Sequence, residues 1–278
     1  MEIGIFAKTF ERDTLVETLD TVVSHGFRHI QFNMQCAGLA PMPDEIDPIL
    51  VRRIRRSCDE RGVVIDALSG TFNMAHPDRE VRALGLRRLE VLTLIAEDLG
   101  TPLITLCTGS RDPDDMWNHH PDNASWDAWQ DLLFCLDAAT MMANEHGFLL
   151  GIEPAPGNVV SDAHKAREIL REVGSDQFGI IFDPANIIDG VPEDHVEAAI
   201  GTALAEIGHR IISVHGKDRD AAGNVVPAGQ GIVPWEFLVS GLRRIGYGGS
   251  IILQGLEEPD VDETAGFLID VIAERQSD

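Results

Sequence analysis

The stretch that decides the fold is FGIIFDPANI, residues 178–187, in which an apolar, β-rich run ends on the carboxylate of Asp183. Three other apolar runs also end on a polar side chain: FLLGIE at 148–153, RIISVH at 210–215 and SIILQ at 250–254. Short apolar runs of this kind are typical of strands that are buried on both faces of a parallel sheet. They predict four successive strands of one sheet.

Four more strands are predicted upstream, and all eight alternate with segments of helical periodicity. The upstream runs are EIGIF at 2–6, RHIQF at 28–32, VVIDAL at 63–68 and PLITLC at 102–107. A doubly wound sheet is the alternative, but it usually carries a glycine-rich phosphate-binding motif that this sequence does not contain. The alternation therefore predicts a single (β/α)8 TIM barrel, with residues 1–278 as one domain.

Composition narrows the function classes. The formal net charge of −24 would repel a nucleic-acid backbone, so no nucleic-acid partner is expected. The N-terminal residues lack a signal-peptide pattern, and no apolar run is long enough to span a membrane, which favours a cytoplasmic protein without a membrane partner. A neutral sugar or polyol fits the acidic chain more simply than an anionic substrate.

The polar residues at the ends of the last four strands are the strongest functional signal. Glu153, Asp183, His215 and Gln254 would meet at the carboxyl-terminal face of the barrel, where such enzymes have their active sites. This set of oxygen and nitrogen donors predicts one divalent metal ion, with Mn²⁺ preferred and Mg²⁺, Co²⁺ or Zn²⁺ as alternatives. Taken singly, each residue has an alternative role as a helix cap, an ion-pair partner or a hydrogen-bonded wall residue.

Several motifs resemble those of the xylose-isomerase-like TIM-barrel family, which includes ketose 3-epimerases, inosose dehydratases and type IV AP endonucleases. They are GIEPAPGN, GIIFDPANI, ISVHGKD and PAGQGIVPWEFLVSGLRRIGYGGSIILQGLEE. The resemblance covers nearly the whole chain and implies metal ligands at Glu153, Asp183 and His215, with a fourth at Gln254, where the family has a glutamate. It also implies a homo-oligomer, because barrels of this family commonly associate.

Two positions depart from the family pattern. Gln254 offers an amide oxygen to a metal but has no charge and cannot act as a base; Glu257 or Glu258 is the alternative carboxylate, unless both are solvated loop residues. Asn186 replaces the substrate-binding histidine of the ketose epimerases and can still bind a sugar hydroxyl. The missing histidine also argues against the trinuclear zinc site of the type IV endonucleases.

Seven residues are predicted to act on the substrate. The catalytic candidates are Glu153 as base, His76 as proton donor or acceptor, and Lys217 as the group that stabilises an enolate oxygen or phosphate. The alternative for His76 is a residue that starts a helix, and the alternative for Lys217 is an ion pair with a neighbouring aspartate. The substrate-binding candidates are Asn186, Trp117, His120 and Arg111.

These features predict a metal-dependent sugar isomerase or epimerase that removes a proton beside a metal-bound carbonyl of a ketose, polyol or keto-sugar derivative. One alternative is a metal-dependent lyase or dehydratase of a keto-sugar or inosose, which needs only one base. The other is a degenerate barrel that binds a sugar without turning it over, for which Gln254 is the main support.

Overall fold

A computed structural model describes residues 1–274 and contains a closed barrel of eight parallel strands. The strands are β1 (Glu2–Phe6), β2 (His29–Phe32), β3 (Val64–Ser69), β4 (Leu103–Cys107), β5 (Leu149–Glu153), β6 (Phe178–Phe182), β7 (Ile211–Arg219) and β9 (Ser250–Leu253). They pair in the order β6-β5-β4-β3-β2-β1-β9-β7, and β7 also pairs with β6, which closes the sheet. All eight predicted strands and the predicted TIM barrel are confirmed.

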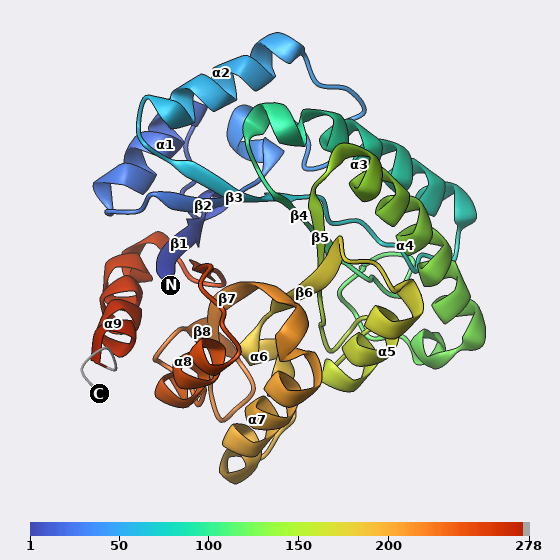
Figure 1. The fold of residues 1–278 in the computed structure, drawn as a ribbon, viewed down its shortest axis with the longest axis vertical. Coiled ribbons are helices and arrows are strands. Elements are labelled where there is room, and N and C mark those ends of the chain that lie inside the picture. The colour runs from blue at the N-terminus through green and yellow to red at the C-terminus, as the bar shows by residue number, and fades with distance from the viewer. Residues whose placement is uncertain (275–278) are drawn as a thin grey trace.

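Helices surround the barrel as an outer ring; Figure 1 shows the strands in the middle and the helices around them. Their bounds are α1 (Leu15–Ser24), α2 (Pro48–Asp59), α3 (Arg79–Leu99), α4 (Trp126–His146), α5 (Ala163–Val173), α7 (Val196–Ile207), α8 (Trp235–Arg244) and α9 (Val261–Glu274), with the single turn α6 (Pro184–Ile187) after β6. In α4, Leu132, Leu136 and Ala139 are buried, whereas Phe134 is 62% exposed. This amphipathic pattern seats the helix on the barrel. No helix within residues 1–274 has the length and apolarity needed to cross a membrane.

Strand β7 extends beyond its predicted end at His215. It continues to Arg219 and forms an antiparallel hairpin with the short strand β8 (Val225–Pro227), which the sequence pattern did not predict. The buried carboxylate of Asp218 holds this extension, because it accepts hydrogen bonds from Trp235 Nε1 at 2.9 Å and from the Val233 amide at 3.0 Å. Asp218 is therefore not the ion-pair partner of Lys217.

Buried asparagines hold the long loop after β4 against its neighbours. Asn158 accepts a hydrogen bond from the Gly109 amide at 3.0 Å and donates to the Met116 carbonyl at 2.8 Å. Asn123, itself part of this loop, accepts from the Arg111 amide and donates to the Gly157 carbonyl. An asparagine side chain both donates and accepts, so each one connects two backbone segments. The rim of the barrel is thus fixed on the side of β4 and β5.

Replacing Asn158 with alanine should loosen this rim. The buried Gly109 amide and the half-buried Met116 carbonyl would lose their partners, which should lower the free energy of unfolding by about 1–3 kcal/mol. Urea unfolding would measure that loss, and hydrogen exchange should show faster exchange at the Gly109 amide. The exposed Asn144→Ala on α4 is the matched control. Wild-type stability and exchange in Asn158→Ala would show that this asparagine does not hold the loop.

Candidate functional site

Three buried ligand-type side chains meet at the carboxyl-terminal ends of β5, β6 and β7. Glu153 is the last residue of β5, Asp183 directly follows β6, and His215 lies within β7. Nδ1 of His215 is 3.5 Å from Glu153 Oε1 and 3.6 Å from Asp183 Oδ2. The strand pairing explains this convergence, because β6 lies between β5 and β7 in the closed sheet.

The donor atoms of this cluster fit a cation. Within residues 1–274, His215 Nδ1 and Gln254 Oε1 are buried and have no hydrogen-bond partner, whereas the buried Asp183 Oδ2 forms an ion pair with Lys217. Buried polar atoms are costly to leave without a partner. Two ligands at right angles on a metal about 2.1 Å away are about 3.0 Å apart, and wider angles separate them further. The observed separations therefore suit one divalent ion held by carboxylate and imidazole ligands.

Lys217 brings a positive charge to the same carboxylates. Its Nζ forms an ion pair with Asp183 Oδ2 and lies 3.7 Å from Glu153 Oε1, and the side chain is 12% exposed. Burial opposes the charged form of Lys217, but the two carboxylates outweigh it and raise the pKa of the ammonium group. The structure therefore places Lys217 beside the carboxylates of Glu153 and Asp183.

The electrostatics of the cluster are strongly coupled. Burial disfavours the imidazolium form of His215, but the negative charges of Glu153 and Asp183 outweigh it and raise the pKa to about 9. Burial also disfavours ionisation of Asp183, yet Lys217 and His215 keep the pKa of this carboxyl below its usual range. The mutual attraction between Asp183 and the positive forms of Lys217 and His215 therefore stabilises charge on all three groups.

A cavity of about 400 Å³ opens beside this cluster. Its lining includes Glu153 and Lys217 together with Trp117, Asn186 and Gln254, all of which the sequence analysis selected. Asn186 donates a hydrogen bond from Nδ2 to Glu153 Oε1 at 2.9 Å, so it also orients this carboxylate. The cavity therefore combines five of the predicted residues in one place.

The eighth-strand position has no nearby substitute carboxylate from the loop that follows it. Glu258 binds Arg12 through both carboxylate oxygens, at 2.5 Å and 2.9 Å, and Glu257 is exposed. Neither residue lines the cavity. Gln254, directly after β9, is thus the polar side chain from this part of the chain that lines the cavity.

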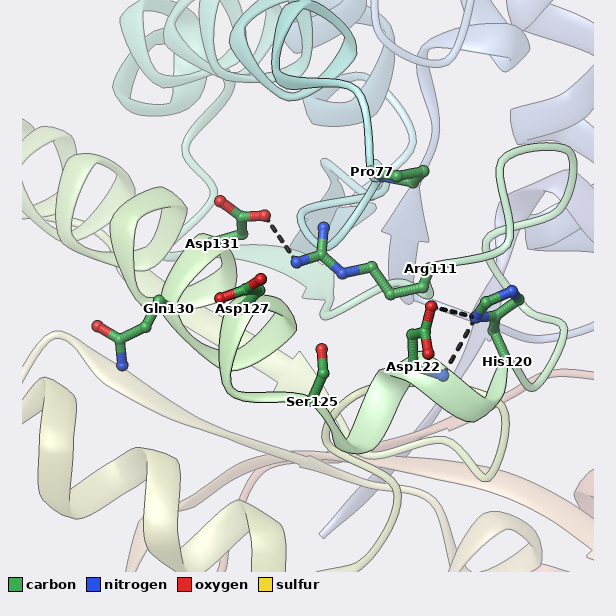
Figure 2. A pocket seen from close by; sticks show the side chains of 8 residues that line it. All are labelled: Pro77, Arg111, His120, Asp122, Ser125, Asp127, Gln130 and Asp131. Atoms are coloured by element: carbon green, nitrogen blue, oxygen red, sulfur yellow. Dashed lines mark hydrogen bonds and ion pairs between the residues drawn. The ribbon is translucent and has the colours of Figure 1, made fainter.

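Arg111 and His120 line a different hollow, which Figure 2 shows. Arg111 reaches from the loop to α4, where it pairs with Asp131 at 2.8 Å and also donates to the Ala75 carbonyl. His120 caps the short turn that precedes α4 by accepting a hydrogen bond from the Asp122 amide. These contacts use both side chains to hold the loop, so the structure does not bring them to the cluster of Glu153, Asp183 and His215.

His76 is also used in local structure. Its Nδ1 accepts a hydrogen bond from the Asp78 amide at 3.0 Å, and its Nε2 lies 3.2 Å from the Pro113 carbonyl oxygen. Both ring nitrogens are therefore engaged by backbone just before α3. The structure does not place His76 on the cavity wall.

Two charged residues of the cavity were not predicted from the sequence. Arg219 and Asp189 both line the cavity and pair with each other at 2.8 Å, while Arg219 Nε donates to the Ala185 carbonyl. Arg219 lies beyond the predicted end of β7, and only the extension of that strand brings it to the cavity. One signal could have revealed Arg219. In a strand, side chains two and four positions apart point to the same face, so a polar residue four positions after His215 would face the same side if the strand continued that far.

Comparisons with solved structures agree with the barrel. D-psicose 3-epimerase, crystallised in the presence of D-fructose, is 20% identical, covers 98% of this chain and 99% of its own, and gives a TM-score of 0.73. The IOLI protein with a binding zinc atom is 16% identical, covers all of both chains and also gives 0.73. The probable 3-DHS dehydratase AsbF, involved in petrobactin synthesis, from Bacillus anthracis is 14% identical, covers 99% of this chain and 100% of its own, and gives 0.75.

Identities this low show a shared fold alone, and the reactions in these descriptions differ. Family membership comes from the sequence itself, since the family model described as "Xylose isomerase-like TIM barrel" matches residues 19–271. This match confirms the resemblance seen in the strand-end motifs. The chain belongs to the xylose isomerase-like TIM barrel family.

Proposed function

We propose that this protein is a divalent-metal-dependent isomerase or epimerase that acts on a ketose, a polyol or a keto-sugar derivative. The observation that carries the proposal is the convergence of Glu153, Asp183 and His215 beside a cavity of sugar size. These three side chains would hold the metal, with Gln254 as an additional oxygen ligand. Mn²⁺ is the preferred ion for this donor set, and Mg²⁺, Co²⁺ or Zn²⁺ are the alternatives.

Glu153 is the proposed base. A divalent cation, when bound, polarises a carbonyl group and makes the adjacent C–H bond more acidic. The carboxylate of Glu153 faces the cavity and is oriented by the amide of Asn186, so it is placed to take that proton. The ammonium group of Lys217, 3.7 Å from Glu153 Oε1, is placed to stabilise the negative charge that then develops.

The charges of the cavity favour an uncharged substrate. Its cationic side chains, Lys217 and Arg219, are both paired with carboxylates of the same site. A phosphate group would have to compete with Asp183 or Asp189 for them. Trp117, which is 45% exposed at the rim, offers an aromatic surface to a sugar ring.

Gln254 favours a second candidate, a lyase or dehydratase. An epimerase with two metal-bound carboxylates would remove and return the proton from opposite faces of the substrate, but Gln254 cannot act as a base. Loss of a leaving group after one proton abstraction needs only Glu153. The two reactions differ in mass balance, because isomerisation conserves the mass of the substrate and dehydration releases water.

Glu153→Gln tests the assignment. We expect wild-type protein to bind about one Mn²⁺ per chain and to exchange solvent deuterium into a ketose from a panel that includes D-fructose. Loss of the base should slow this exchange at least about a hundredfold. Glu258→Gln, which alters a carboxylate outside the cavity, should retain the wild-type rate.

Mass spectrometry of the products separates isomerisation from dehydration. Unchanged exchange in Glu153→Gln would exclude Glu153 as the base. Bound sugar without exchange, even with metal loaded, would identify a binding protein in place of either enzyme.

The pH dependence of Mn²⁺ binding gives an independent test. His215, with a pKa of about 9 in the metal-free protein, must lose its Nδ1 proton to become a ligand. Below that pKa, the association constant should rise about tenfold for each pH unit, and it should level off above it. Isothermal titration between about pH 6 and about pH 8 measures the slope, with the exposed His195→Ala as a control and His215→Ala expected to abolish binding. A flat profile would contradict ligation by His215.

A further inference from the structure

A chain of buried polar side chains leads from His215 into the barrel. His215 Nε2 lies 3.3 Å from Gln31 Oε1, and Gln31 Nε2 donates a hydrogen bond to Ser69 Oγ at 3.1 Å. The three side chains come from β7, β2 and β3, and all are buried. Of these three residues, only His215 was predicted from the sequence to belong to the site.

The chemistry of His215, Gln31 and Ser69 fixes the direction of each hydrogen bond between them. An amide nitrogen that faced an imidazole N–H would oppose two donors, so the oxygen of Gln31 must face His215 when Nε2 carries a proton. The nitrogen of the same amide then faces Ser69, whose hydroxyl oxygen accepts. With Nε2 protonated, Nδ1 is the ring nitrogen left to bind a metal, and it points at Glu153 and Asp183.

The backbone also singles out Gln31. The pairing of β2 with β3 shifts register between Ile30 and Gln31, so Gln31 is aligned with Ala67 while Ile30 is aligned with Ile65. Such irregularities re-aim side chains next to functional sites. Here the shift accompanies the contact between Gln31 and Ser69, two residues beyond Ala67.

We propose that Gln31, supported by Ser69, is the positioning residue that aims His215 Nδ1 at the metal-binding cluster. Its role depends on the metal site of the proposed function but on no particular substrate or reaction. Gln31 provides a neutral acceptor for the outer ring nitrogen. A metal-ligating histidine commonly needs such a partner to fix the orientation of its ring.

Metal affinity tests the proposal with three variants. Gln31→Leu removes the acceptor and should weaken Mn²⁺ binding by about 10- to 100-fold, whereas Gln31→Glu keeps an acceptor and should stay within about threefold of wild type. Thr105→Val is the matched control, because Thr105 is another buried residue of the barrel whose hydroxyl has no hydrogen-bond partner within residues 1–274. It should bind Mn²⁺ like wild type. If Gln31→Leu does not fold, Ser69→Ala takes its place, with a smaller loss of affinity expected because Gln31 remains but its amide is less constrained.

The Nε2 proton of His215 gives a second readout that needs neither metal nor substrate. In histidine-selective ¹⁵N NMR of the metal-free protein, this proton should exchange faster with water in Gln31→Leu than in wild type and should shift downfield in Gln31→Glu. If wild type binds no metal but shows this pattern, the proposed function fails while the contact stands. Unchanged Mn²⁺ affinity in Gln31→Leu, or equal losses in Gln31→Leu and Gln31→Glu, would overturn the positioning role.

Discussion

Strand β7 pairs with both β6 and β9, and the arrangement of the site depends on this double pairing. It closes the sheet and places the end of β7 between the strand ends that carry Asp183 and Gln254. The same strand supplies His215 and Lys217, and its extension beyond the barrel carries Arg219. One strand therefore delivers a metal-ligand candidate and both cations of the cavity. The buried carboxylate of Asp218 stabilises this extension from within the hairpin region.

Charge balance is the second constraint on the site. Glu153 and Asp183 are buried in a chain whose formal net charge is −24, and buried carboxylates need compensation. Lys217 and the imidazolium form of His215 provide it in the metal-free protein. In the proposed function, a bound divalent ion would add two positive charges while His215 loses one proton and Lys217 keeps its charge. Metal binding at this centre would therefore be coupled to the loss of a proton from His215.

The sequence was sufficient to predict the barrel and the convergence of Glu153, Asp183 and His215, because both depend on strand order and on the residue at the end of each strand. Trp117 and Asn186, which were predicted to bind the substrate, both line the cavity. It did not reveal that Arg111 and His120 point toward α4 and a loop turn, since the path of a long loop is set by tertiary contacts. Gln31 was missed for a related reason: a glutamine in a short apolar run has no local signal that connects it to a histidine 184 positions away.

The loop held by Asn123 and Asn158 also has a consequence for how substrates are selected. Its backbone passes so close to the loop after β5 that a Cβ atom at Gly157 would lie 1.8 Å from the Trp117 carbonyl oxygen. Glycine is therefore required where the two loops cross. The backbone at Trp117 is held both by this contact and by the hydrogen bonds of Asn123 and Asn158. Under the proposed function, an entrance with so fixed a backbone would select substrates by its shape. New side chains along residues 115–118 would then be the route to a changed substrate range, whereas insertions there would disturb the backbone crossing at Gly157.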